Sequence, residues 1–277
     1  MSNYTNKKVL LASMHKKEQA IQEPFENIVG CKLIVASDFN TDLFGTFSGE
    51  TKRLLSAFDT LKHKAVIAAN TYNVDYIISS EGSFGPHPSY MFLNSDTEML
   101  LFYDRTNELF IYEYEISTDT NLNEIEITAH TDYSDFLTKT KFPSHALILK
   151  ANNQVLAKGI TQQDELEVLI KNNLTTFKYL KLETDMRAMY NPSRMKVINN
   201  LAYKLAQRVA NNCIKCNTPG FGLLKTSGAL ICELCLSPTK IKKYNNYCCI
   251  KCDYTIQTLI NPEVEFANPR YCDYCNP

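Results

Sequence analysis

The sequence predicts an α/β fold, with a mixed twisted sheet flanked by helices, followed by a cysteine-rich C-terminal module. Short apolar, β-branched runs alternate with helical patterns through the first 195 residues. Nine of the ten cysteines fall between Cys213 and Cys275. Residues 196–277 hold ten Lys and Arg against five Asp and Glu, a net charge of +5, whereas residues 1–195 hold 19 against 25, a net charge of −6. We therefore expect an α/β domain over 1–195, a connecting helix over 196–212 and a metal-binding module over 213–277.

The elements of the first domain follow from local patterns, taken in chain order. A strand, a helix and a second strand are expected over 8–12, 18–29 and 32–36, and residues 51–70 repeat apolar side chains at helical spacing. A strand over 75–79 should end in the loop 80–88, where two glycines and two prolines indicate an irregular backbone. The runs 99–104 and 109–116 predict an antiparallel hairpin. Further strands are expected at 146–149 and 155–158, and further helices at 134–141, at 162–172 and from Asn191 onward.

Composition narrows the class of protein. The chain has 277 residues, of which 44% are apolar and 21% charged, so it can bury a core and is not generally disordered. A net charge of −1 argues against a strongly basic nucleic-acid-binding protein as a whole. No apolar run approaches a signal peptide core or the ~18 residues of a membrane span. We expect a cytoplasmic protein without a membrane partner, in a compartment where clustered thiols hold metal more often than they form disulfides.

The C-terminal module contains four Cys-x-x-Cys pairs, at Cys213/Cys216, Cys232/Cys235, Cys249/Cys252 and Cys272/Cys275. Fifteen residues separate the first two pairs and nineteen the last two, which is typical of four-cysteine zinc ribbons. Sequential pairing over 213–235 and 249–275 is expected, and pairing of the first with the third pair stays open. The module is therefore predicted to be a double zinc ribbon with two structural Zn²⁺ ions, although iron or an iron–sulfur cluster would use the same ligands. Cys248 lies outside the four pairs and is not expected to bind either metal ion.

Polar clusters in the acidic domain suggest a site for an anionic ligand. One cluster lies at the first strand-to-helix turn, one on the helix over 51–70, one in the loop 79–88 and one over 183–194. For the first, second and fourth clusters the plainer interpretations are a solvated helix start, a solvated helix face and a salt-bridge network, respectively. For the loop 79–88, a functional role is the better interpretation. The catalytic candidates are Glu50, Glu81 and Asp185, and the candidates for phosphate or substrate binding are Ser13, His15, Lys17, Lys64, His87, Arg187 and Arg194.

The sequence shows two resemblances to known families. SEGSFGPHPS (80–89) and ETDMRAMYNPSRM (183–195), followed by two zinc ribbons, resemble an uncharacterised bacterial family defined by a domain of unknown function. The first domain more distantly resembles the inosine triphosphate pyrophosphatase superfamily, which removes damaged nucleoside triphosphates. The matching segments, in the order of that superfamily, are Ser13–Glu18, Thr46–Glu50, Lys64–Ala65, Glu81–Gly82 and Ser193–Arg194.

The second resemblance implies a fold and roles for individual residues. It implies a pyrophosphatase-like α/β domain in which Lys17, Lys64 and Arg194 contact phosphates, and Glu50 and Glu81 hold Mg²⁺ or activate water. The expected activity is Mg²⁺-dependent hydrolysis of a nucleoside triphosphate or a related phosphorylated nucleotide. Two alternatives are a non-catalytic zinc-ribbon protein that binds nucleic acid or a protein through its basic tail, and a nucleotide sensor. A homo-oligomer also stays open.

Overall fold

The computed structural model describes residues 2–36, 39 and 55–277. It divides into two compact units, Asn3–Gln207 and Arg208–Pro277, which are considered separately. The division falls near the end of helix α5 (Pro192–Ala210), so most of the expected connecting helix belongs to the first unit. Within the described ranges, none of the helices combines the length and apolarity needed to cross a bilayer.

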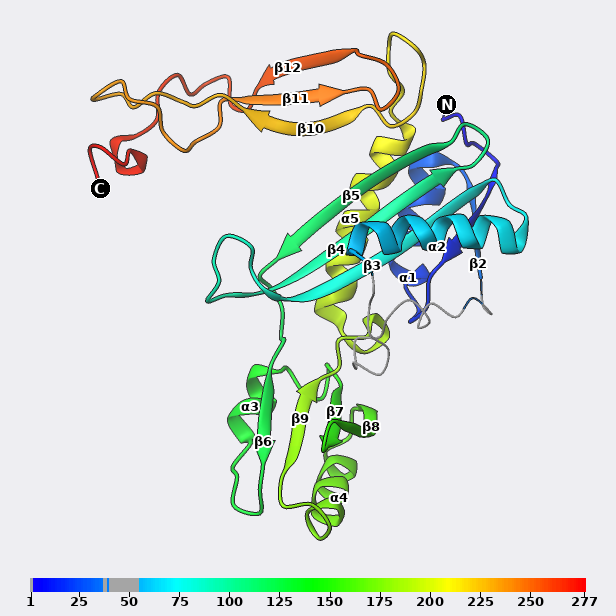
Figure 1. Ribbon diagram of the computed structural model, residues 1–277, viewed down its shortest axis with the longest axis vertical. Coiled ribbons are helices and arrows are strands. Elements are labelled where there is room, and N and C mark those ends of the chain that lie inside the picture. The colour runs from blue at the N-terminus through cyan, green and yellow to red at the C-terminus, as the bar shows by residue number, and fades with distance from the viewer. Residues whose placement is uncertain (1, 37–38, 40–54) are drawn as a thin grey trace. The chain divides into compact units, whose positions relative to one another are not determined.

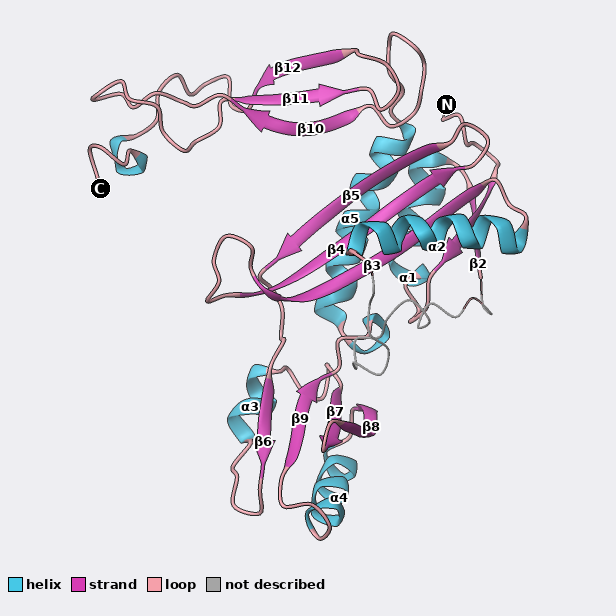
Figure 2. Cartoon of the chain, viewed as in Figure 1, coloured by secondary structure: helices cyan, strands magenta, loops and turns pink. Residues whose placement is uncertain are grey.

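A five-stranded mixed sheet forms the centre of the first unit (Figures 1 and 2). Its strand order is β2-β1-β3-β4-β5, with β1 parallel to both β2 and β3, and β4 antiparallel to both β3 and β5. This arrangement confirms the expected mixed sheet with helices. The strands are β1 (Lys8–Ala12), β2 (Lys32–Val35), β3 (Tyr76–Pro86), β4 (Asn94–Asp104) and β5 (Leu109–Ser117).

Helices cover the two faces of this sheet (Figure 1). On one face, α2 (Ala57–Tyr72) packs Leu61 and Ala65 against Ile77 of β3 and Leu101 of β4. On the other face lie α5 and α1 (Glu18–Pro24), the latter continued by the π-helical η1 (Phe25–Val29). The Phe25 ring lies 6.4 Å from that of Phe102. Side chains alternate across a strand, so odd-numbered residues of β3 face α2 and even-numbered ones face α1 and α5.

Strand β3 is longer than the sequence indicates. It was expected to end at Ser79 and give way to a loop, but it runs to Pro86 and is paired throughout with β4, from Tyr76 opposite Asp104 to Pro86 opposite Asn94. The glycine and proline signals were therefore misleading. A long antiparallel partner supplies hydrogen bonds for this segment, which outweighs its poor local strand propensity.

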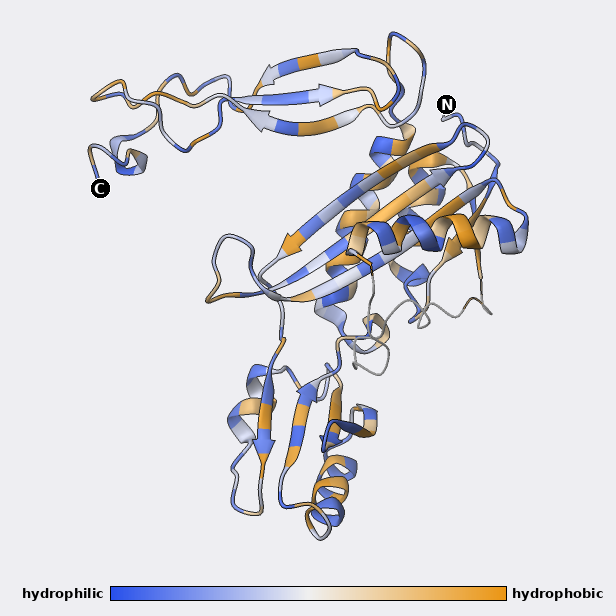
Figure 3. Cartoon of the chain, viewed as in Figure 1, coloured by the Kyte–Doolittle hydropathy of each residue, from blue (hydrophilic) through white to orange (hydrophobic). Residues whose placement is uncertain are grey.

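A second, antiparallel sheet lies between the first sheet and α5 in the sequence. Its order is β6-β9-β7-β8, and Leu147, Leu166 and Leu182 are among the residues of its core. Apolar and polar residues alternate along β9, as Figure 3 shows, because one face of the strand is buried. The elements are β6 (Glu124–Ile127), α3 (Ser134–Lys139), β7 (Leu147–Ala151), β8 (Gln154–Ile160), α4 (Gln163–Leu174), β9 (Leu180–Thr184) and the short 3₁₀ helix η3 (Ala188–Tyr190).

The second unit is built on a three-stranded antiparallel sheet of order β10-β11-β12. Its strands are β10 (Gly222–Ser227), β11 (Tyr244–Cys248) and β12 (Thr255–Leu259), and the 3₁₀ helix η4 (Pro269–Tyr271) follows. The side chains of these strands are half-buried or exposed. The sheet therefore has little apolar core of its own, and the unit needs another source of stability.

Two substitutions on α4 test the core of the second sheet. Leu166 is fully buried, whereas Val168, two residues later, is 56% exposed. We expect Leu166→Ala to lower the free energy of unfolding by about 2–5 kcal/mol, because it removes buried methyl groups and leaves a cavity. Val168→Ala is the matched control and should change it by less than about 0.5 kcal/mol. Urea denaturation followed by circular dichroism measures both, and equal effects would contradict the packing described.

Candidate functional site

The turn after β1 places a lysine in the protein interior. Ala12 of β1 pairs with Ser79 of β3, so the chain leaves the sheet beside Ser80. The Lys17 ammonium donates to Ser80 Oγ at 2.9 Å, and its side chain is almost fully buried. In the turn between Ala12 and Lys17, His15 and Lys16 have φ values of 67° and 56°. Two consecutive non-glycine residues in the left-handed region are strained, which is a feature found often at functional sites.

Glu98 of β4 forms ion pairs with two basic side chains. Arg194, in the first turn of α5, donates its Nε to Glu98 Oε1 at 2.5 Å, and Lys17 Nζ lies 3.8 Å from Oε2. Arg194 also donates to the Met186 carbonyl oxygen and lies over the Phe84 ring at 5.0 Å. Burial pushes the pKa of Glu98 up, but the two cations outweigh burial and hold it below its ordinary value. Glu98 is therefore ionised.

Gly82 is required for this contact. It lies opposite Glu98 in the β3–β4 ladder and on the same face of the sheet. A Cβ atom there would lie 2.5 Å from Arg194 Nη2 and 2.6 Å from Glu98 Oε1. Any other residue would collide with both partners, so this glycine serves a close side-chain approach and not a turn.

Asp96 is a second buried carboxyl, two residues before Glu98 on the same face of β4. Among the described residues, Asp96 Oδ1 and Glu98 Oε2 have no hydrogen-bond donor. A proton shared between the two carboxyls would satisfy both oxygens. Burial and the negative charge of Glu98 raise the pKa of Asp96 to about 8, so Asp96 is mainly a neutral acid at pH 7.

The charge of this cluster is unbalanced. Burial, followed by the charge of Arg194, lowers the pKa of Lys17 to about 8, so Lys17 is still mainly charged at pH 7. Lys17 and Arg194 then face one ionised carboxylate, Glu98, together with neutral Asp96. Counted over the described residues, these four side chains carry one positive charge in excess. Two cationic side chains next to one ionised carboxylate suit an anion. Asp96 and Glu98 are not among the site residues predicted from the sequence. The available signal for them is two acidic residues two positions apart in Asn-Ser-Asp-Thr-Glu, which lie on one face of a strand.

Lys64 and Glu81 form a separate buried pair. Lys64 Nζ lies 2.6 Å from Glu81 Oε1, and both side chains are about 6% exposed. Glu81 is an odd-numbered residue of β3 and so faces α2, opposite the face that carries Gly82 and Glu98. Both members of the pair still act on the pKa of Lys17 through their charges, so the two groups are neighbours. The expected candidates are thus divided between the two faces of one strand.

Asp185 and Arg187 form a third group next to the first. Arg187 Nε lies 3.0 Å from Asp185 Oδ1, and Nη2 lies 2.6 Å from Oδ2. His15 is near enough that Lys17, Arg194 and Arg187 all contribute, after burial, to lowering its pKa to about 4. His15 is therefore neutral at pH 7. Ser13 joins the first group through Ser80, at 2.9 Å between the hydroxyl oxygens.

Two candidates lie elsewhere. His87 follows β3, where its Nδ1 accepts from the Ser89 backbone N–H at 3.1 Å and its ring lies 5.1 Å from that of Tyr90. It is five residues beyond Gly82 along the chain, which amounts to roughly 16 Å of extended strand. His87 therefore does not join the cluster around Glu98. Glu50 falls outside the described residues.

The cysteines of the second unit form two groups of four. In each group the sulfur atoms all lie within 4.8 Å of one another. Cys213 and Cys252 are 3.7 Å apart at sulfur, and Cys235 and Cys272 are 3.6 Å apart. A tetrahedron with corners ~2.3 Å from its centre has edges of about 3.8 Å, so the spacing suits zinc and is too long for disulfides. The groups are Cys213, Cys216, Cys249 and Cys252, and Cys232, Cys235, Cys272 and Cys275.

The pairing is crossed, which corrects the sequential pairing over 213–235 and 249–275. Strand β10 separates the first Cys-x-x-Cys pair from the second, and its six residues place them at opposite ends of the sheet. Antiparallel pairing of Gly222 with Cys248 then brings the third pair beside the first. A bridge between Cys232 and Ala267 brings the fourth beside the second. Cys248 belongs to neither group.

Metal binding would change the charge of the C-terminal part of the chain. Four thiolates around one Zn²⁺ leave a net charge of −2, so two such sites would cancel four of the five positive charges over residues 196–277. Nucleic-acid binding through a basic tail depends on that excess. Bound zinc would therefore weaken the support for a nucleic-acid interface in this unit.

Comparison with known proteins identifies a family. The model of a domain of unknown function, DUF6671, matches residues 64–277, which is more than half of the chain. The chain belongs to the DUF6671 family. No curated protein matches it. The matched range includes Glu98, Arg194 and all eight clustered cysteines, and it begins after β1 and Lys17. Because the function of this domain is unknown, the match assigns no activity to the site.

Zinc content of double variants tests the crossed pairing. Cys213→Ser with Cys249→Ser should lose one Zn²⁺ per chain, because both residues serve the same site. Cys213→Ser with Cys232→Ser should lose both, because each residue serves a different site. Atomic absorption of purified protein gives the counts, and Cys248→Ser is the control that should keep two. The reverse result for the two double variants would restore sequential pairing.

Asp96 should make stability fall as the pH rises. Its folded pKa of about 8 lies above the value of an unfolded Asp near 3.8, so between these limits the folded state holds a proton that the unfolded state has lost. The stabilisation is complete below pH 4 and lost by pH 8, with a slope of up to about 1.4 kcal/mol per pH unit. We expect Asp96→Asn to flatten this slope in urea unfolding at pH 5 to 8. An unchanged slope would show that Asp96 is already ionised in the folded state.

Proposed function

We propose that the unit Asn3–Gln207 is a Mg²⁺-dependent hydrolase of a nucleoside triphosphate or a related phosphorylated nucleotide. The observation that carries the proposal is the buried cluster in which Lys17 and Arg194 converge on Glu98, with Asp96 protonated beside it. These groups come from the β1–α1 turn, α5 and β4. Burying two cations and two carboxyls is unfavourable for stability alone, which supports a role in binding.

Lys17 and Arg194 are suited to bind phosphate oxygens. An arginine fork and a lysine ammonium are the usual protein partners of phosphate, and the excess positive charge favours an anion. Glu98 and the Met186 carbonyl oxygen accept hydrogen bonds from Arg194, so its guanidinium is oriented before a ligand arrives. Orientation in advance lowers the entropy lost on binding.

The carboxyl groups allow a test of the expected magnesium site. Both carboxylate oxygens of Asp185 accept hydrogen bonds from Arg187, and Glu81 Oε1 accepts one from Lys64. These two residues therefore have fewer lone pairs available to bind a cation. Asp96 Oδ1 and Glu98 Oε2 have no donor among the described residues and fit a hard divalent ion that takes one or two carboxylates together with substrate phosphates. In the proposal Mg²⁺ displaces the proton of Asp96, and the two carboxylates then hold the ion. Bound there, the ion would shield phosphate charge and lower the pKa of an attacking water.

The order of the motifs gives further support. Lys17 and Arg194 occupy the positions at which the inosine triphosphate pyrophosphatase superfamily places phosphate-contacting residues, by the resemblance described above. Lys64 and Glu81 match the same pattern but form their own pair on the α2 face. In the proposal they act through the electrostatic field at Lys17 and not as direct ligands.

Adjacent lysines provide a matched test of the activity. Lys17→Gln should lower the turnover of triphosphates with Mg²⁺ by about 10²–10³-fold, because it removes a cation that stabilises phosphate charge. Lys16→Gln changes the exposed neighbour and should leave turnover within about twofold. The assay measures phosphate and pyrophosphate release from a panel that includes the inosine and xanthosine forms.

Three results would contradict the hydrolase. These are no turnover of any member of the panel, equal losses in the two variants, and binding of a triphosphate without release of products. The last result would favour a nucleotide sensor. Circular dichroism and zinc content of each variant show that a loss of activity is not a loss of fold.

A further inference from the structure

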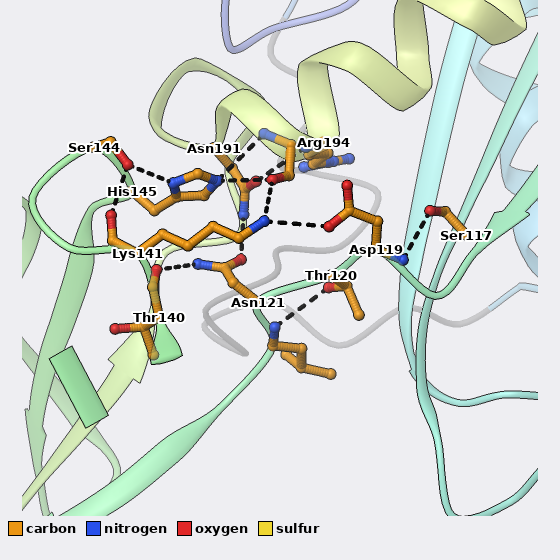
Figure 4. Close-up of polar contacts among 12 residues, drawn as sticks. Ser117, Asp119, Thr120, Asn121, Thr140, Lys141, Ser144, His145, Asn191 and Arg194 are labelled. Carbon is orange, nitrogen blue, oxygen red and sulfur yellow. Dashed lines mark hydrogen bonds and ion pairs between the residues drawn. The ribbon is translucent and has the colours of Figure 1, made fainter. Parts of the chain in front are cut away.

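A second polar cluster in the first unit surrounds the hydroxyl of Ser193, at the start of α5. His145 Nε2 lies 3.1 Å from Ser193 Oγ, and Lys141 Nζ donates to the same oxygen at 3.0 Å. Figure 4 shows Lys141, Ser144 and His145 on the segment that precedes β7, with Asp119 on the chain that leaves β5. One hydroxyl thus contacts both an imidazole and an ammonium group. This cluster contains none of the residues of the proposed phosphate site.

The hydrogen bonds determine the tautomer of His145. Ser144 Oγ donates to the Lys141 carbonyl oxygen at 2.6 Å, so it must accept at 2.9 Å from His145 Nδ1. The proton is therefore on Nδ1, and Nε2 offers its lone pair to Ser193. The Ser193 backbone N–H also points at Nε2, at 3.3 Å. Burial, followed by the charge of Lys141, lowers the pKa of His145, which keeps the ring neutral at pH 7.

Helix capping accounts for only part of this arrangement. The backbone contact between Ser193 N–H and His145 caps α5, and Asn191 caps it further by accepting from the Arg194 N–H at 3.0 Å. Neither cap needs a hydroxyl at position 193 or a cation beside it. Nucleophilic catalysis would use both, because the base removes the hydroxyl proton and a nearby cation stabilises the negative charge that develops.

We propose that Ser193 is a nucleophile, with His145 as its general base, in the hydrolysis of small carboxylic esters. Ser144 fixes the imidazole, in the position that an acidic residue takes in a serine triad. Solvent reaches the cluster, since the side chains of Lys141 and Asp119 are 45% and 68% exposed. The site is independent of the proposed nucleotide hydrolysis.

The reaction balances with water as the only co-reactant. Ser193 Oγ bonds to the ester carbonyl carbon while its proton passes to His145 Nε2, and the carbonyl electron pair moves to the oxygen beside Lys141. Collapse breaks the bond to the alcohol, which leaves with the proton from Nε2. Water then attacks the acyl carbon, gives a proton to Nε2, and releases a carboxylic acid as Ser193 takes the proton back.

The charges favour a neutral ester over a phosphate. Lys141 Nζ lies 3.2 Å from Asp119 Oδ1, so the cluster with neutral His145 has no net charge. The backbone N–H groups of Ser193 and Arg194 are taken by His145 and Asn191, which leaves Lys141 to stabilise the oxyanion. A single donor suits an activated ester and not an amide.

Two probes test the proposal on the full-length protein. An alkyl fluorophosphonate should modify Ser193, identified by tandem mass spectrometry of the peptide that contains it. Hydrolysis of p-nitrophenyl acetate should fall at least about 100-fold in Ser193→Ala. Ser134→Ala changes a serine in the first turn of α3 and is the control, which should keep both the label and the turnover.

His145→Gln separates the base from the cap, because a glutamine side chain can still accept from the backbone N–H but cannot take up the proton. It should retain the melting temperature within a few degrees and lose the turnover. The absence of label on Ser193 in folded wild-type protein would overturn the proposal. So would turnover in Ser193→Ala equal to that of wild type. Triphosphate hydrolysis in Ser193→Ala should be unchanged, so failure of either proposal is visible separately.

Discussion

The buried contact of Glu98 with Arg194 and Lys17 is the constraint around which the first unit is built. Glu98 lies within the central sheet, and its two partners belong to segments at opposite ends of the unit's sequence. Removing one partner from such a contact costs about 3–5 kcal/mol, whereas replacing the whole set by apolar residues is often neutral or stabilising. Stability alone therefore gives little reason for the cluster, and its cationic excess gives a chemical one.

Several local features follow from this contact. Gly82 is needed because any Cβ there would collide with both Arg194 and Glu98. Asp96 holds its proton because it is buried and because Glu98 beside it is ionised. The position of Arg194 in turn requires α5 to begin where it does, and Asn191 caps the helix at that point. The same first turn presents Ser193 to His145, so one helix start positions both polar clusters.

The sequence predicted what depends on local pattern and missed what depends on distant partners. Cys-x-x-Cys spacing identified the eight clustered thiols, and helical periodicity identified α2 and α5. The pairing of the thiols could not be read from spacing, because the position of Cys249 beside Cys213 depends on the β10–β11 ladder. The length of β3 and the importance of Glu98 likewise depend on β4 and α5. Lys64 and Glu81, which were candidates from the sequence, pair with each other, and strand alternation places Glu81 on the face of β3 opposite Gly82.

The net charge of a domain does not show where an anion would bind. The acidic first 195 residues, with a net charge of −6, contain a buried group with positive charge in excess, because Asp96 is protonated and Glu98 is shared by two cations. The tail with formal charge +5 would lose most of that charge once eight thiolates surround two zinc ions. Binding responds to the field at a site over a few ångströms and not to a sum over a domain. The proposed phosphate site therefore lies in the acidic part of the chain, where the protonation of Asp96 leaves one positive charge in excess.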